Sequence, residues 1–144
     1  DHEVRMRDGS TLIEILLVVT LVAATTGVAV PAMARLRDRV SVRLAAADAT
    51  RALADARSAA LTAARRTAVH LDSAAATLVV HAGDDTLRIV PLAPYGVRLR
   101  ATRDSIAFGP HGLGWGAATT TITLERGAAR TALAVSRLGR VRRL

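Results

Sequence analysis

The first long feature of the chain is a run of uncharged, mostly apolar residues from Ile15 to Ala34. The run has 20 residues, the length that an α-helix needs to cross about 30 Å of hydrocarbon. A secretory signal peptide is the competing interpretation, but its apolar part is usually only about 7 to 15 residues long. The pattern therefore predicts a transmembrane helix, in which Pro31 should produce a kink or remove one backbone hydrogen bond.

The next segment, residues 35–67, contains no Gly or Pro and is rich in Ala. Apolar residues recur in it at spacings of 4, 4 and 3, at Leu36, Val40, Leu44 and Ala47. This spacing predicts an amphipathic helix that continues the membrane helix, with these four residues as its apolar stripe. Asp and Arg residues are interspersed along the segment, which is typical of a solvated helix face.

After Thr67 the pattern changes to short apolar runs separated by Gly, Pro or Asp. The runs are residues 68–72, 77–82, 86–90, 97–102, 105–108, 119–125 and 129–136. Their length and composition predict β-strands. Gly83 with Asp84 and Asp85 suits a hairpin turn, and Arg126 with Gly127 suits another, so neighbouring strands should be antiparallel. The predicted fold class is α+β, a long N-terminal hydrophobic helix followed by a small antiparallel β domain.

Composition narrows the possible functions. The 144 residues allow one small globular unit with one appended element, which excludes two separate enzymatic domains. All 20 basic residues are Arg, and the net charge is +8. This charge suits an anionic partner such as nucleic acid or lipid headgroups, although a basic surface that serves only solubility explains it as well. Cysteine is absent, which excludes disulfides and thiol chemistry.

A carboxylate stands at the start of the apolar helix, in the sequence Gly9, Ser10, Thr11, Leu12, Ile13, Glu14. An acidic residue at the centre of a membrane helix costs about 2.5 to 3.5 kcal/mol and less near its end. If the chain were cut after Gly9, the new amine of Ser10 would lie one helical turn before Glu14 and could pair with it or with a neighbouring subunit's Glu14. Alternatively, Glu14 reaches the membrane interface from the first turn, where it suits the helix dipole.

This segment resembles the N-terminal signature of the type IV pilin superfamily, in which Gly9, Thr11 to Glu14 and Pro31 all match. The resemblance implies cleavage between Gly9 and Ser10 by a prepilin peptidase, N-methylation of Ser10, and roles in assembly for Glu14 and Pro31. It also implies a single pass through the bacterial inner membrane by residues 12–34, with the globular part in the periplasm. The partners implied are other pilins or pseudopilins in a helical fibre.

A second resemblance lies near the other end of the chain, where Phe108, Gly109, Pro110 and Gly112, then residues 121–125 and 134–142, look like the GspH/FimT group. GspH-like proteins are minor pseudopilins, structural subunits of the type II secretion pseudopilus that assists protein export across the outer membrane. FimT-like proteins are minor pilins of type IV pili, and some bind DNA for uptake through a Gly-Arg-x-Arg element, which corresponds here to residues 139–142. The first function is the one we expect, and the second is the alternative.

Four arginines cluster near the C-terminus, on what the sequence suggests is a flexible tail: Arg137, Arg140, Arg142 and Arg143. Guanidinium groups bind phosphate in bidentate fashion, so the cluster is a possible DNA-binding site of weak, salt-sensitive affinity. The simpler alternative is that the tail pairs with acidic groups on neighbouring subunits. No aromatic residue interleaves with these arginines to stack on bases.

No catalytic or cofactor site is expected. The four histidines, His2, His70, His81 and His111, lack metal-ligand spacing, and no nucleophile elbow is present. Gly112, Gly114 and Gly116 do not precede a helix pattern, as a phosphate loop requires. Trp115 is expected to cap the β core from a loop, with a partner-facing position as the alternative. We therefore expect no enzyme activity, no metal and no cofactor.

These inferences together predict four regions along the chain. They are a prepilin leader at 1–9, a transmembrane or fibre-core helix at 10–34, an amphipathic periplasmic half of the helix at 35–67, and a β-rich globular domain with a basic C-terminal tail at 68–144.

Overall fold

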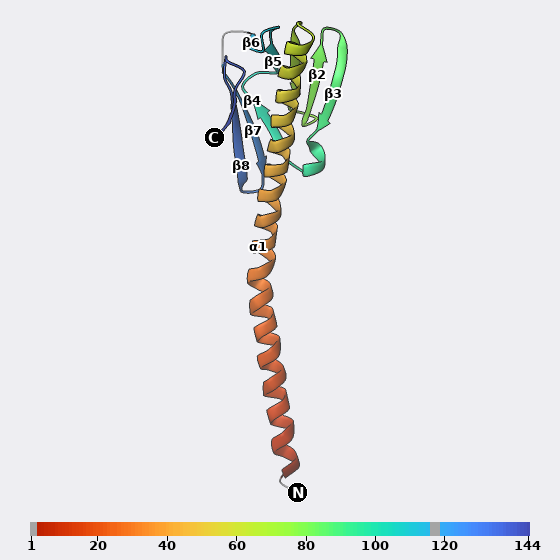
Figure 1. Ribbon diagram of the computed structural model, residues 1–144. Helices are drawn as coiled ribbons and strands as arrows, with labels where there is room; N and C mark the ends of the chain where they lie inside the picture. Colours follow the sequence, from red (N-terminus) through yellow and green to blue (C-terminus); the bar gives the residue numbers. More distant parts are fainter. Residues whose placement is uncertain (1–2, 116–118) are drawn as a thin grey trace. The chain divides into compact units, whose positions relative to one another are not determined.

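The computed structural model describes the backbone of residues 3–115 and 119–144 and the side chains of residues 11–27, 29–115 and 119–144. The chain divides into two compact units, residues 1–36 and 37–144. One helix, α1 (Glu3–Thr62), makes up the described part of the first unit and continues into the second (Figure 1). All the described strands belong to the second unit and pair antiparallel. The predicted α+β fold class is therefore confirmed.

In the first unit α1 is apolar and exposed. Within the described residues it provides the one segment long and apolar enough to cross a membrane, with a mean hydropathy of 2.3 over its most apolar part. The hydroxyl of Thr20 donates a hydrogen bond of 2.7 Å to the carbonyl of Leu16 one turn earlier, so this polar group needs no outside partner. The helix continues through Pro31, whose missing N–H leaves the carbonyl of Gly27 without its helical donor.

In the second unit α1 buries a face made almost entirely of alanine. The buried positions are Val42, Ala45, Ala46, Ala49, Ala52, Leu53, Ala56 and Ala60. The predicted apolar stripe is therefore wrong: Leu36, Val40 and Leu44 are 55%, 44% and 50% exposed, and Ala47 is exposed as well. Two stripes with helical spacing coexist in this segment, and the strands pack against the one with the smaller side chains, which allows the closer approach of the two backbones.

The helix ends at Thr62, earlier than the boundary near Thr67 that composition suggests. Ala64 adopts a left-handed conformation with φ of 48°, which an α-helix cannot contain. Thr67 is instead the first residue of a strand, and its side chain is fully buried. No Gly or Pro marks this boundary, so the sequence contains no local signal for it.

The strands form two antiparallel sheets. The first has the order β3-β2-β1-β5-β6, where β1 is Thr67–Asp72, β2 is Thr77–Ala82, β3 is Asp85–Pro91, β5 is Ser105–Phe108 and β6 is Gly114–Trp115. The second has the order β4-β7-β8-β9, where β4 is Arg98–Ala101, β7 is Thr120–Arg126, β8 is Ala129–Val135 and β9 is Val141–Arg143. A 3-10 turn, η1 (Ala93–Tyr95), joins β3 to β4. In Figure 1 strands β2 and β3 lie to one side of the upper part of α1, and β7 and β8 lie to the other.

The predicted strands and both predicted hairpin turns are present. Gly83 and Asp84 connect β2 to β3, and Gly127 and Ala128 connect β7 to β8. Both glycines have positive φ, 66° and 53°, as tight two-residue hairpins require. Two short strands were not predicted, β6 and β9.

One hydrophobic core joins the alanine face of α1 to the inner faces of both sheets. Phe108 is fully buried in it, while Tyr95 is partly buried against it. The prediction that Trp115 caps the core from a loop is wrong, because Trp115 lies in β6 and its side chain is 63% exposed. Its ring instead faces the guanidinium of Arg66, whose carbon lies 5.7 Å from the ring centroid.

Candidate functional sites

The C-terminal arginines do not lie on a flexible tail. The segment after β8 turns at residues 136–140 and returns as β9, which pairs with β8 so that Arg142 lies opposite Ala134 and Arg143 opposite Leu133. The turn is closed by a hydrogen bond of 2.9 Å from the Ser136 N–H to the Arg140 carbonyl. The tail prediction is therefore wrong, because strand pairing along β8 holds a segment whose own sequence is too short and too charged to suggest a strand.

Gly139 makes this turn possible. It is buried and has φ of 70°. A Cβ atom at this position would lie 2.6 Å from the carbonyl oxygen of Gly112 and 3.2 Å from Nε of Arg57. The turn thus packs directly on the loop around Gly112, to which Arg57 of α1 donates a hydrogen bond of 2.9 Å.

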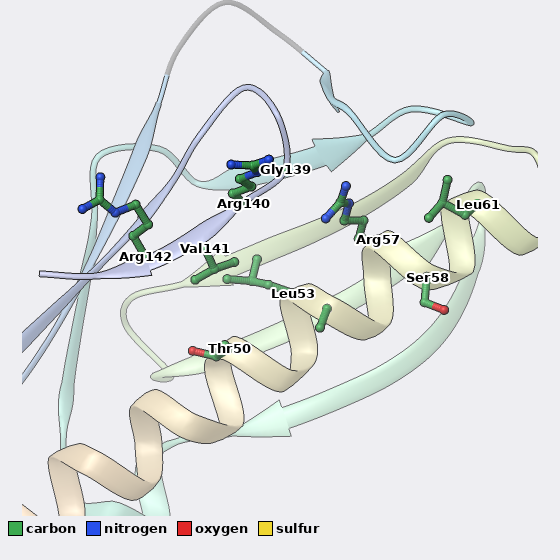
Figure 2. Close-up of a pocket in the computed structure, with 10 residues that line it drawn as sticks. Thr50, Leu53, Arg57, Ser58, Leu61, Gly139, Arg140, Val141 and Arg142 are labelled. Atoms are coloured by element: carbon green, nitrogen blue, oxygen red, sulfur yellow. The ribbon is translucent and has the colours of Figure 1, made fainter.

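A groove of about 590 Å³ lies between α1 and the β9 segment. Leu53, Ala54, Leu61 and Val141 contribute apolar surface to it, and Thr50 and Ser58 contribute hydroxyl groups. Arg57 comes from the helix side, and Arg140 and Arg142 come from the facing segment (Figure 2). Within the described part of the chain, these three arginines form no ion pair with a carboxylate. The groove can therefore hold an anionic group whose less polar part lies on the apolar surface.

The four C-terminal arginines that the sequence groups together separate onto three surfaces. Arg140 and Arg142 line the groove just described. Arg143 lies beside Arg39, Arg43 and Arg130 around a second hollow. Arg137 lies near Trp115 and Arg103, and its carbonyl accepts a hydrogen bond of 2.8 Å from Gly114. Sequence reasoning missed Arg57, which lies more than 80 residues from Arg140 and has no local signal that links the two.

The N-terminal site residues lie on α1. Gly9 and Ser10 are helical in their backbone, and their side chains lie outside the described residues. Glu14 is exposed at the start of the apolar segment, one helical turn after Ser10. Pro31 lies inside the helix, near the end of that segment.

The part of the chain that the structure describes contains no cluster of three or more His, Cys, Asp or Glu side chains that could hold a metal ion. Of the glycines considered for a phosphate loop, Gly112 precedes the strand β6, Gly114 is its first residue, and Gly116 lies outside the described residues.

Comparison with known proteins places these features in a wider group. Residues 45–139 match the model of the family described as type II transport protein GspH. This match begins in the alanine face of α1 and ends at Gly139, just before Arg140 and Arg142. Among curated proteins, none matches the chain.

Two solved proteins have the same fold. The type IV minor pilin FimU of Pseudomonas aeruginosa is 17% identical with a TM-score of 0.63, and the match covers 72% of this chain and 88% of FimU. The minor pseudopilin EpsH of the type 2 secretion system of Vibrio cholerae is 13% identical with a TM-score of 0.57, and the match covers 72% of this chain and 96% of EpsH.

Proposed function

This chain belongs to the GspH family, and from that premise we propose that it is a minor pseudopilin, a subunit of the type II secretion pseudopilus that assists protein export across the outer membrane. The family is one of structural pilin-like subunits, so we propose a structural role without catalysis. The observation that supports this role best is the combination of the family match over residues 45–139 with an exposed apolar helix before it.

The apolar helix requires an apolar environment. Large side chains along it are more than half exposed, among them Leu12, Ile13 and Leu17 at 63%, 69% and 69%. Exposed to water, such a surface would be costly, at about 25 cal/mol for each Å² of apolar area. A bilayer covers this surface before assembly, and the equivalent helices of other pilin-type subunits cover it in the fibre.

Glu14 is the residue of this helix that can set its register against the helices of neighbouring subunits. We propose that a prepilin peptidase cuts between Gly9 and Ser10, that the new amine of Ser10 is methylated, and that it pairs with Glu14 of this or a neighbouring subunit. In this arrangement the chain passes once through the inner membrane with its second unit in the periplasm. Pro31 leaves an unpaired carbonyl at Gly27, where the apolar helix can bend during packing.

The test is the variant Glu14→Ala in the full chain, expressed together with the other subunits of its secretion system. We expect normal recovery in the membrane fraction and loss from sheared fibres. Asp84→Asn, in the exposed turn between β2 and β3, removes a carboxylate outside the helix and should leave incorporation unchanged. Normal incorporation of the Glu14 variant would contradict the proposed role.

A second function, DNA binding, is favoured by one observation. Arg140 and Arg142 line the groove with Arg57, and none of the three has an acidic partner in the described residues. A structure that holds guanidinium groups in place loses less entropy on binding phosphate than a flexible tail does. With only a few phosphate contacts, affinity should be weak and fall steeply with salt.

The variant Arg140→Ala/Arg142→Ala tests this second function in the full chain, solubilised in neutral detergent. Retardation of single-stranded DNA at low salt should be lost, and it should persist in Arg98→Ala/Arg100→Ala, which removes two exposed arginines of β4. Equal retardation by both double variants would show that net charge alone attracts the DNA.

A further inference from the structure

The second arginine hollow lies between α1 and the hairpin of β7 and β8, and it belongs wholly to the second unit. It has a volume of about 290 Å³. Its lining consists of Arg39, Val42, Arg43, Ala128, Ala129, Arg130 and Arg143. Four arginines, two from α1 and one each from β8 and β9, therefore line one hollow, although about 100 residues separate the first from the last.

The hollow carries an excess of positive charge. Arg130 pairs with Glu125 of the neighbouring strand, with Nε 3.3 Å from Oε1. The other nearby acid, Asp38, pairs with Arg126 at 2.9 Å. Arg39, Arg43 and Arg143 have no carboxylate partner within the chain segments that the structure describes. Three charges thus face one small space without compensation, which is favourable only when an anion is near.

The arrangement is also partly fixed before any ligand arrives. Nε of Arg143 donates a hydrogen bond of 3.0 Å to Oγ1 of Thr131, whose side chain is buried. This contact uses one donor of the guanidinium and leaves the others for a ligand. Val42 is buried and belongs to the core, so the helix wall of the hollow is held in place by packing.

The size and the place of the hollow favour one kind of anion. A volume of about 290 Å³ suits a single phosphate ester better than a stretch of polymer. Arg39 follows Ala34, the last residue of the apolar run, by five residues. Five residues span at most about 18 Å in any conformation. Lipid headgroups form a layer about 5 to 8 Å thick on each side of the hydrocarbon. The chain length between Ala34 and Arg39 therefore keeps Arg39 close enough to the membrane surface for a lipid phosphate to be an available anion.

We propose that this hollow binds the phosphate group of an anionic phospholipid while the subunit is anchored in the membrane. Arg39, Arg43 and Arg143 contact the phosphate, and Arg130 borders the site while held by Glu125. The binding adds a second contact of the subunit with the membrane before assembly. The inference rests on anchoring by the apolar helix, and it does not depend on which secretion or pilus machine the subunit serves.

The test measures lipids bound to the full chain in neutral detergent by native mass spectrometry. We expect phosphatidylglycerol to bind in preference to phosphatidylcholine. Each arginine near an anionic lipid surface contributes about a five-fold factor, so Arg39→Gln/Arg43→Gln should weaken phosphatidylglycerol binding by about 25-fold. Both substitutions lie at exposed helix positions, so they leave the core untouched. Arg98→Gln/Arg100→Gln removes the same charge from β4 and serves as the control.

Four outcomes would overturn the proposal. Equal binding of the two lipids by the unmodified chain would show no selectivity for the anionic headgroup. Equal loss in both double variants would show that net charge alone attracts the lipid. Inorganic phosphate that displaces the lipid at equal concentration, or loss of DNA retardation in Arg39→Gln/Arg43→Gln without loss of lipid binding, would assign the hollow to another ligand.

Discussion

Nε of Arg126 lies 2.9 Å from Oδ1 of Asp38, which ties the hairpin of β7 and β8 to α1 near the start of the second unit. The same guanidinium donates to the hydroxyl of Ser41 at 3.0 Å and to the carbonyl of Tyr95. Both charged side chains are about three-quarters buried, at 23% and 26% exposure. One arginine therefore connects the helix, a hairpin and the 3-10 turn, three elements distant in sequence.

We expect Arg126→Ala to lower the free energy of unfolding by about 1 to 3 kcal/mol, because it leaves a partly buried carboxylate and a carbonyl without their donor. Urea denaturation of the detergent-solubilised chain measures this loss. Arg88 pairs with Asp55 at the surface, where both side chains are at least 40% exposed. Arg88→Ala should therefore cost less than about 1 kcal/mol. Equal costs for the two variants would contradict a structural role for the Arg126 contacts.

The alanine face of α1 should resist enlargement. Ala49 is fully buried, so Ala49→Leu forces extra methyl groups into a filled interface and should cost about 1 to 3 kcal/mol. Ala47 lies two residues earlier on the same helix and is exposed, so Ala47→Leu should change stability by less than about 0.5 kcal/mol. Thermal unfolding followed by circular dichroism compares the two. A tolerated Ala49→Leu would mean that this face does not contact the strands closely.

Gly139→Ala should destabilise the turn before β9 for two reasons that a matched variant separates. An alanine in the left-handed backbone conformation lowers the free energy of unfolding by about 1 to 2 kcal/mol. Its Cβ atom would also clash with the Gly112 carbonyl. Gly83→Ala has a similar φ of 66° but open space around its Cβ, so it carries only the first cost. We expect Gly139→Ala to cost at least about 1 kcal/mol more. Chemical denaturation measures both, and equal losses would show that the turn moves freely.

The contact between Tyr95 and Asp48 can be checked by spectroscopy, since Tyr95 is the one tyrosine of the chain. Its hydroxyl donates a hydrogen bond of 2.5 Å to Asp48, and this bond, together with burial and the charge of Asp48, raises the pKa of Tyr95 above its ordinary value of 10.0, while Arg51 partly opposes the shift. The folded state thus favours the protonated phenol. The stability that this adds is present below pH 10.0 and is lost as pH rises through the higher folded pKa.

Ultraviolet absorbance of the tyrosinate form measures this pKa. We expect Asp48→Asn to move the transition back toward its ordinary pH, because the charged acceptor is gone. Arg51→Gln should move it in the opposite direction. An unchanged transition in both variants would mean that Tyr95 and Asp48 do not interact in solution.

The elements of this fold that carry strong local signals were predictable from the sequence. The apolar part of α1 is predicted by its length and hydropathy alone. The hairpins at Gly83 and Gly127 are predicted by residues suited to positive φ. Burial alternates along β2, where Leu78, Val80 and Ala82 face inward, and along β8, where Thr131, Leu133 and Val135 do so.

The features that depend on distant contacts were not predictable. Which face of α1 is buried depends on the shape of the strands, and spacing alone favoured Leu36, Val40 and Leu44 over the alanines. Strand β9 exists because β8 offers it a free edge. Arg140 and Arg143 are three residues apart in the sequence, yet they line different surfaces, because the pairing of β9 with β8 decides where each one lies.

The alanine face limits which amino-acid substitutions this protein can accept during evolution. Alanine is the smallest residue that still favours a helix, so every substitution at Ala45, Ala49, Ala52 or Ala56 either adds volume against a strand or, with glycine, weakens the helix by about 1 kcal/mol. Larger side chains become acceptable only if the opposing strand residue shrinks at the same time. These positions should therefore change in pairs with their partners, while Leu36, Val40 and Leu44 are free to follow whichever subunit lies beside them.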